Sequence, residues 1–134
     1  MLKLRYIFSL LLLLCLCLTS CAPMLFLGGA AAGVGGYKYY NDVLTVVYEA
    51  SFDNTWDASV KALEDMGFTI ENKTEELGSG KISTKEDEKN KKINLTLEYR
   101  SAQETEVTIR VGLLGDKTAS TVIKDKIESL LFKK

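Results

Sequence analysis

The feature that most constrains the fold is a pair of alternating segments in the second half of the chain. Apolar side chains occupy every second position from Ile93 to Tyr99 and again from Val107 to Val111, with polar residues between them. Successive side chains of a strand point to opposite faces, so each segment has one apolar and one polar face. A short polar stretch separates the segments, which predicts an antiparallel hairpin in a sheet with one dry and one solvated face.

Two segments with helical periodicity flank this hairpin in the sequence. The first begins at Ser51, which can cap a helix, runs to Met66 and is stopped by Gly67; the second is capped by Asp116 or Thr118 and runs towards the C-terminus. Apolar positions three and four residues apart form a stripe on each, at Phe52, Trp56, Val60 and Leu63 and at Ala119, Ile123, Ile127, Leu130 and Leu131. Each helix therefore has one face that can pack on a sheet, and we expect Trp56 in the core.

Shorter runs predict the remaining strands. Residues 44–48 are β-branched, apolar or aromatic, a further strand starts at Phe68, and a Gly-Ser-Gly turn at 78–80 leads into residues 81–84. The order is then strand, helix, four strands, helix. We therefore expect an α+β fold, a two-layer sandwich with an antiparallel sheet of about four to five strands and two helices, formed by residues 41–134 as a single domain.

Composition excludes several function classes. The 134 residues contain no histidine, which removes histidine-ligated metals and histidine general bases. The 17 basic and 18 acidic residues leave a charge of -1, unlike the basic surface that binds nucleic acid. The acidic run 86–88 lacks the alternate spacing and the glycine of a calcium loop, and lysines flank it. We therefore predict a protein that is not an enzyme, with no metal, no cofactor and no nucleic-acid partner.

The N-terminus has the layout of a secretory signal. Lys3 and Arg5 precede an apolar run from Tyr6 to Leu18 that is interrupted only by Ser9. A basic start followed by about 7 to 15 apolar residues is typical of a signal peptide. The run is too short to span a bilayer comfortably, since a spanning helix needs about 20 apolar residues. We assign residues 1–20 to a signal peptide that is not part of the fold.

The residues after this run indicate lipid attachment. Residues 18–21, with sequence LTSC, are similar to the lipobox of bacterial lipoproteins, an aliphatic residue, two small residues and a cysteine. The resemblance implies cleavage between Ser20 and Cys21, an S-diacylglyceryl group on Cys21 and an N-acyl chain such as palmitate on its amino group. Ala22 in place of aspartate favours the outer over the inner membrane. We expect a lipid-anchored protein of the bacterial cell envelope, facing the periplasm.

The lipidated cysteine is followed by a Gly/Ala-rich segment, residues 21–40, which we assign to a tether. Its pattern of small residues at 29–33 allows two such segments to pack at the bilayer, or serves as a hinge. Tyr37, Tyr39 and Tyr40 surround Lys38 near its end. They form either an aromatic and cationic belt at the level of the lipid head groups or the first packing of the domain; both readings are open.

Two leucines stand between glycines where the last strand meets the last helix. Leu113 and Leu114 lie between Gly112 and Gly115. They either plug the end of the core or form an apolar lip for a partner. We expect the plug; the lip would make Leu113 and Leu114 an interaction site.

Taken together, these segments resemble a family of small bacterial lipoproteins known only as a domain of unknown function, the 3568 class. The likeness rests on the lipobox cysteine, the Gly/Ala-rich segment with clustered tyrosines, and residues 56–58, 62–68 and 109–116. It implies no reaction and no catalytic residues. We expect a non-catalytic binding or structural module with an envelope protein as partner, reached through the exposed sheet face or the 112–116 loop. The alternative is a periplasmic carrier of a small apolar ligand or lipid.

Overall fold

The computed structural model describes residues 1–7, 9, 34–85, 88–89 and 91–133. The chain divides into two compact units, Met1–Ala30 and Ala31–Lys134. Residues 2–7 of the first unit are helical. No helix among the described residues is both long enough and apolar enough to cross a membrane.

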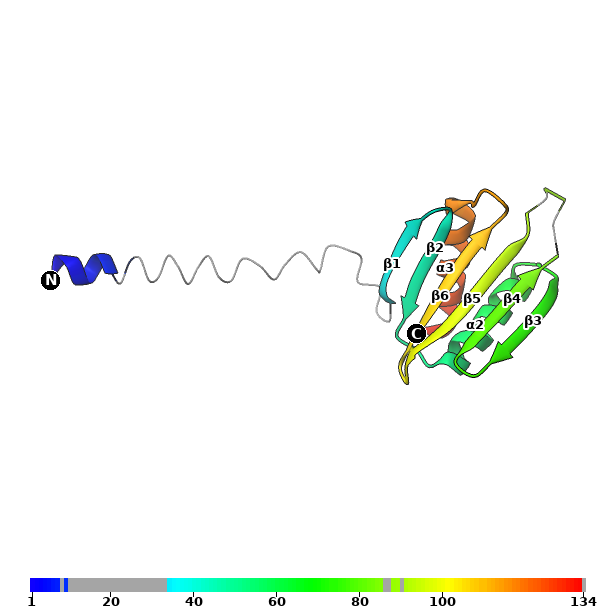
Figure 1. Ribbon diagram of the computed structural model, residues 1–134, viewed down its shortest axis with the longest axis horizontal. Helices are drawn as coiled ribbons and strands as arrows, with labels where there is room; N and C mark the ends of the chain where they lie inside the picture. The colour runs from blue at the N-terminus through cyan, green and yellow to red at the C-terminus, as the bar shows by residue number, and fades with distance from the viewer. Residues whose placement is uncertain (8, 10–33, 86–87, 90, 134) are drawn as a thin grey trace. The chain divides into compact units, whose positions relative to one another are not determined.

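The second unit consists of one six-stranded sheet and two helices (Figure 1). The spatial order is β1-β2-β6-β5-β4-β3, and all neighbouring strands are antiparallel. Helices α2 (Phe52–Asp65) and α3 (Lys117–Leu131) pack against each other and cover one face. The strands are β1 (Val34–Tyr40), β2 (Val43–Tyr48), β3 (Ile70–Glu76), β4 (Ser79–Thr84), β5 (Ile93–Ser101) and β6 (Glu104–Val111). The expected α+β sandwich is confirmed, but four to five strands was too few.

The predicted hairpin is strands β5 and β6 at the centre of the sheet. Leu95 lies opposite Ile109, and Leu97 lies opposite Val107. All four side chains are at most 1% exposed. Alternation therefore set both the face and the register, because a slip by one residue would turn each of these side chains to the solvated face.

Both helices begin at expected caps. The Ser51 hydroxyl accepts a hydrogen bond from the Asn54 N–H at 3.4 Å, and the Asp116 carboxylate accepts one from the Ala119 N–H at 2.9 Å. Each satisfies a backbone donor that the first helical turn leaves unpaired. Asp116, rather than Thr118, is therefore the cap of α3.

The core lies between the helices and the covered face of the sheet. Trp56 of α2 is only 8% exposed and stacks on Phe52 with ring centroids 6.3 Å apart, which confirms its expected place. Tyr48 of β2 is fully buried, and its hydroxyl donates a 2.9 Å hydrogen bond to the Lys124 carbonyl of α3. Because a buried hydroxyl needs a partner, this bond fixes α3 against the sheet.

Strand β1 corrects the boundary expected at Asn41. Tyr37 lies opposite Val46 and Tyr39 opposite Leu44, so both tyrosines share the helix-covered face. The ammonium groups of Lys124 and Lys117 lie 5.1 and 5.8 Å from the two ring centroids, within range of a cation–π contact. The sheet therefore begins at Val34, and Tyr37 and Tyr39 contact lysines of α3, whereas Tyr40 is 72% exposed.

A turn signal for this strand was present in the sequence. Asn41 and Asp42 both have positive φ, 48° and 64°, and they form the two-residue connection between β1 and β2. Asparagine and aspartate are favoured in such hairpin turns. The glycines at the start of β1 resemble a linker, and the strand forms because β2 supplies its hydrogen-bonding partner.

Candidate functional site

Two ends of the sheet carry the candidate sites. Strand β1 begins at one end, the Val34 end, where the β2–α2 connection and the last turn of α3 also lie. The other end holds the β1–β2 turn and residues 112–115, which we name the leucine loop. A seven-residue strand such as β1 separates the two ends by about 23 Å.

The leucine loop projects into solvent. Leu113 and Leu114 are 84% and 80% exposed, so the expectation that they plug the core is wrong. Val111, which is 3% exposed, already fills that part of the core. Gly112 and Gly115 both have φ of +71°, a left-handed conformation that turns the chain outward at each side of the leucines.

Hydrogen bonds to β6 and to the residue before β5 hold the first half of this loop. The Arg110 guanidinium of β6 donates a 2.7 Å hydrogen bond to the carbonyl of Leu113. The N–H of Gly112 donates a 2.8 Å bond to the carbonyl of Lys92, just before β5. The exposed leucines therefore stand on a backbone that is fixed by its neighbours.

Packing and an ion pair hold the second half. Gly115 rests against Asp42 of the β1–β2 turn, where a Cβ on the glycine would lie 2.4 Å from the Asp42 carbonyl oxygen. The Lys91 ammonium lies 2.5 Å from the Asp116 carboxylate. The Ala119 N–H and the Lys91 ammonium hold the pKa of Asp116 below its ordinary value. The cap of α3 therefore remains charged at neutral pH and anchors the loop.

A cavity of about 310 Å³ lies at the same end of the domain. Its lining comes from the end of α2, the start of α3, the adjoining ends of β5 and β6, and two lysines before β5. The lining residues are Met66, Phe68, Lys89, Lys91, Ile93, Val111, Ala119, Val122 and Ile123. Most of this surface is apolar, which suits a hydrophobic guest.

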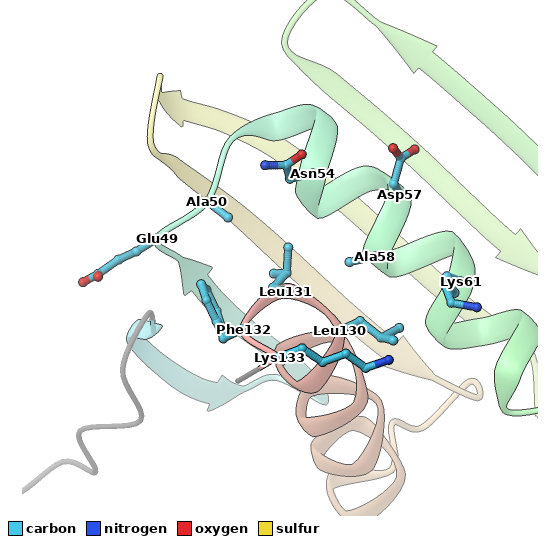
Figure 2. A pocket seen from close by; sticks show the side chains of 10 residues that line it. All are labelled: Glu49, Ala50, Asn54, Asp57, Ala58, Lys61, Leu130, Leu131, Phe132 and Lys133. Carbon is cyan, nitrogen blue, oxygen red and sulfur yellow. The ribbon is translucent and has the colours of Figure 1, made fainter.

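A larger groove, of about 570 Å³, lies at the Val34 end (Figure 2). Figure 2 shows it between α2 and the last turn of α3, with the β2–α2 connection on one side. Apolar groups from α3 meet charged residues of both signs there. The lining residues are Glu49, Ala50, Asn54, Asp57, Ala58, Lys61, Leu130, Leu131, Phe132 and Lys133.

The uncovered sheet face is polar at its centre. Thr45, Thr108 and Thr96 lie side by side on β2, β6 and β5, with Lys38 of β1 next to Thr45 and Lys81 of β4 next to Thr96. Since threonine hydroxyls are well solvated, this face needs no apolar cover. The apolar surface at Leu113 and Leu114 is the more specific feature.

Reactive groups are sparse in the part of the chain that the structure describes. There, no three His, Cys, Asp or Glu side chains are placed to hold a metal ion together. Burial raises the pKa of Tyr48 well above its ordinary value, so its hydroxyl stays protonated and serves as a structural donor. The predicted cleavage and lipidation residues, Ser20 and Cys21, lie outside the described residues.

The sheet and its two helices form a small α+β domain, and the leucine loop exposes an apolar surface at one end of it. A family model described as "Protein of unknown function (DUF3568)" matches residues 2–129. The chain belongs to this family, and the match includes the N-terminal residues as well as the domain. A comparison with curated proteins found no match to the chain.

Proposed function

We propose that the protein is a lipid-anchored lipoprotein of the bacterial envelope whose domain docks a partner protein on the leucine loop. The observation that carries this proposal is the exposure of Leu113 and Leu114, 84% and 80%, on a loop that Arg110 of β6, Lys92 and the β1–β2 turn hold in place. Catalysis plays no part in this role.

The energetics favour binding at this loop. Burying a leucine side chain contributes about 1.5–3 kcal/mol, so two leucines offer a partner about 3–6 kcal/mol before the costs of association. The hydrogen bonds of the leucine loop and its packing against Asp42 already fix its backbone, so little conformational entropy remains to be lost on binding. A partner with an apolar pocket would therefore find a prepared surface.

The anchoring role is supported by the sequence of the first 22 residues. Lys3, Arg5 and the apolar run precede residues 18–21 in the order of a lipoprotein signal, and Ala22 favours the outer membrane. Acyl chains on Cys21 would give stable membrane attachment, because two or more lipid signals suffice for it. The tether joins the domain at Val34, so the leucine loop lies at the opposite end of β1.

Replacing the anchor cysteine tests the first half of the proposal. In cells fed an alkyne analogue of palmitate, the wild-type chain should incorporate label and Cys21→Ala should lose it, because the thiol is the attachment atom. Cys17→Ala is the matched control, since this cysteine lies in the apolar run and should leave labelling unchanged. Equal incorporation by wild type and Cys21→Ala would refute the anchor.

Crosslinking tests the docking role. A photoreactive residue in place of Lys117, next to the loop, should give one discrete protein adduct in cells. The double variant Leu113→Ser with Leu114→Ser should reduce that adduct by about tenfold or more, since losing about 1.4 kcal/mol of binding already weakens affinity tenfold. Exposed substitutions of this kind change stability by only about 0.5 kcal/mol, so the fold should persist.

Leu77→Ser supplies the matched control for this experiment. Leu77 is fully exposed at the β3–β4 turn, so its loss removes the same kind of apolar side chain from a different surface. The adduct should be unchanged in this variant. An adduct that survives the double substitution at the loop, or that falls equally in Leu77→Ser, would remove the leucine loop from the function.

The second candidate role, a periplasmic carrier of a small apolar ligand, is supported by the cavity at the leucine-loop end. Its volume of about 310 Å³ lies at the lower limit of ordinary small-molecule sites, which run from about 300 to 1,000 Å³. Docking and carrying use different surfaces, and neither role requires the other.

A further inference from the structure

Strand β1 forms one edge of the sheet, and β3 forms the other (Figure 1). Among the described strands, only β2 pairs with β1. The outer side of an edge strand presents unpaired N–H and C=O groups, which can pair with a strand of another chain. Natural sheets protect such edges with proline, charge or bulges. Both edges have a bulge near their start, so other features must distinguish them.

The backbone groups of Tyr37 and Tyr39 point towards the free side of β1. The β1–β2 turn has two residues, both with positive φ, and a hairpin turn of this kind closes on a hydrogen-bonded pair, here Tyr40 and Val43. Bonded and non-bonded pairs alternate along antiparallel strands. Tyr40 and Lys38 therefore bond to β2, and the two residues between and before them direct their N–H and C=O groups outward.

The side chains of β1 leave this edge accessible. Its seven residues include no proline and one charge, Lys38, which lies on the uncovered face of the sheet beside Thr45. Tyr37 lies on the helix-covered face but is 60% exposed, since α3 packs mainly on β2 and β6. The edge therefore combines free backbone groups with an aromatic side chain that the helices leave open to solvent.

A second copy of β1 complements this edge. In the antiparallel register that overlaps all seven residues, Tyr37 lies opposite Tyr37 of the second copy, and Lys38 lies opposite Gly36. Aromatic pairs across two strands are favourable, and no like charges face each other in this register. The outward N–H and C=O groups of the two central tyrosines also face each other, as a hydrogen-bonded pair requires.

The other edge of the sheet opposes pairing with itself. In the same full-length antiparallel register, Lys73 of β3 would lie opposite Lys73 of a second copy, and Glu71 would lie opposite Glu75. Like charges directly opposite each other destabilise a strand pair. The charge pattern therefore protects β3 against self-pairing, and β1 has no such protection.

We propose that two copies of the chain pair antiparallel through β1, so that one sheet continues across a two-fold axis at Tyr37. The pairing joins identical surfaces, so it closes as a dimer. Seven residues are few compared with the about 20–30 that each partner contributes to a stable interface, so the dimer should be reversible. The proposal goes beyond the docking role and depends neither on the leucine loop nor on the lipid anchor.

Photocrosslinking in cells tests the pairing on the full-length chain. Two copies with different C-terminal affinity tags are co-expressed, each with a photoreactive residue in place of Tyr40, which the register places opposite Val34 of the second copy. Irradiation should give an adduct of twice the mass of the chain that carries both tags. Its crosslinked peptides should join position 40 of one copy to residues 34–40 of the other.

Glu76 is the matched control position for the photoreactive residue. It is the exposed last residue of β3, as Tyr40 is of β1. The same probe at position 76 should give at least about fivefold less two-tag adduct, which corresponds to about 1 kcal/mol. Equal yields from the two positions would indicate crowding at the membrane and would overturn the proposal.

Charge substitutions at Tyr37 test the register. Tyr37→Glu in both copies should reduce the two-tag adduct by about fivefold, or about 1 kcal/mol, because it removes the aromatic pair and sets like charges opposite each other. Tyr37→Lys in both copies should do the same. A Tyr37→Glu copy expressed with a Tyr37→Lys copy should restore the adduct, since opposite charges then face each other. Reduced adduct without restoration would overturn the register.

Three further outcomes would overturn the proposal. Crosslinks from position 40 to residues 70–76 of the second copy would mean that unlike edges pair, which produces a growing sheet. A discrete adduct with a different protein, and none with both tags, would assign the edge to that protein. Loss of the two-tag adduct in the double variant Leu113→Ser with Leu114→Ser would place the contact on the leucine loop. The crosslink map keeps Tyr37, so it decides the question even if the charge variants fail to fold.

Discussion

Gly115→Ala should lower the free energy of unfolding by about 3 kcal/mol or more, a large effect for one methyl group. Two costs combine at this position. Gly115 has φ of +71°, where a residue with a Cβ loses about 1–2 kcal/mol. Its Cβ would also lie 2.4 Å from both the Cβ and the carbonyl oxygen of Asp42, so the backbone of the β1–β2 turn would have to move.

Gly112→Ala is the matched control for this prediction. Gly112 has the same φ of +71°, but a Cβ there would meet only the Lys91 side chain, at 3.8 Å. The loss should therefore be limited to the conformational cost, about 1–2 kcal/mol. Urea unfolding of both variants measures the difference in their free energies of unfolding, and we expect m, the dependence of that free energy on urea concentration, to be unchanged. Equal losses would contradict this prediction, because they would mean that the β1–β2 turn makes room for the added Cβ at no cost.

Gly80→Ala should cost about 2 kcal/mol because the Trp56 side chain occupies the space of the missing Cβ. A Cβ at position 80 would lie 2.4 Å from Cζ3 of the Trp56 ring and 2.8 Å from Cε3. Position 80 is on β4 and Trp56 is on α2, so relief requires a shift between helix and sheet. Trp56 is the one tryptophan of the chain, so its fluorescence reports the displacement directly.

A double-mutant cycle separates this clash from a general effect of substituting glycine. In a Trp56→Leu background, Gly80→Ala should cost much less, and a coupling energy of about 1 kcal/mol or more is expected for residues in contact. Gly35→Ala is the matched control, because a Cβ there meets Val47 at an ordinary 3.5 Å. It should change stability by about 0.5 kcal/mol at most. A strictly additive cycle would contradict the packing of Trp56 over Gly80.

Much of the fold could be predicted because its signals are local. Alternation at Leu95 and Leu97 specified a half-buried strand, the cap at Ser51 marked the start of α2, and the start of α3 was narrowed to Asp116 or Thr118. Strand β1 was missed because its glycines resemble a linker, and only the partner strand β2 makes them extended. Local patterns cannot report a strand whose stability comes from its neighbour.

The candidate sites likewise could be predicted only where their signal is local in the sequence. Leu113 and Leu114 were singled out from the sequence, yet the prediction that they point into the core was wrong. Their orientation depends on whether Val111 and Ile123 already fill the core. The cavity was not located at all. Its lining comes from four separate segments, and no spacing along the chain connects Phe68 with Val122.

The sequence by itself determined the α+β class, the two helices, the cap at Ser51 and the central hairpin, because each depends on side chains that are close along the chain. It also carries the whole case for lipidation at Cys21, which rests on adjacent residues. Only the tertiary structure decided where the sheet begins, which way Leu113 and Leu114 point, and that Gly80 and Gly115 must lack a Cβ. Each of these depends on contacts between segments that are distant in the sequence. Because protein interiors are closely packed, the space at each position is known only once the whole chain is folded.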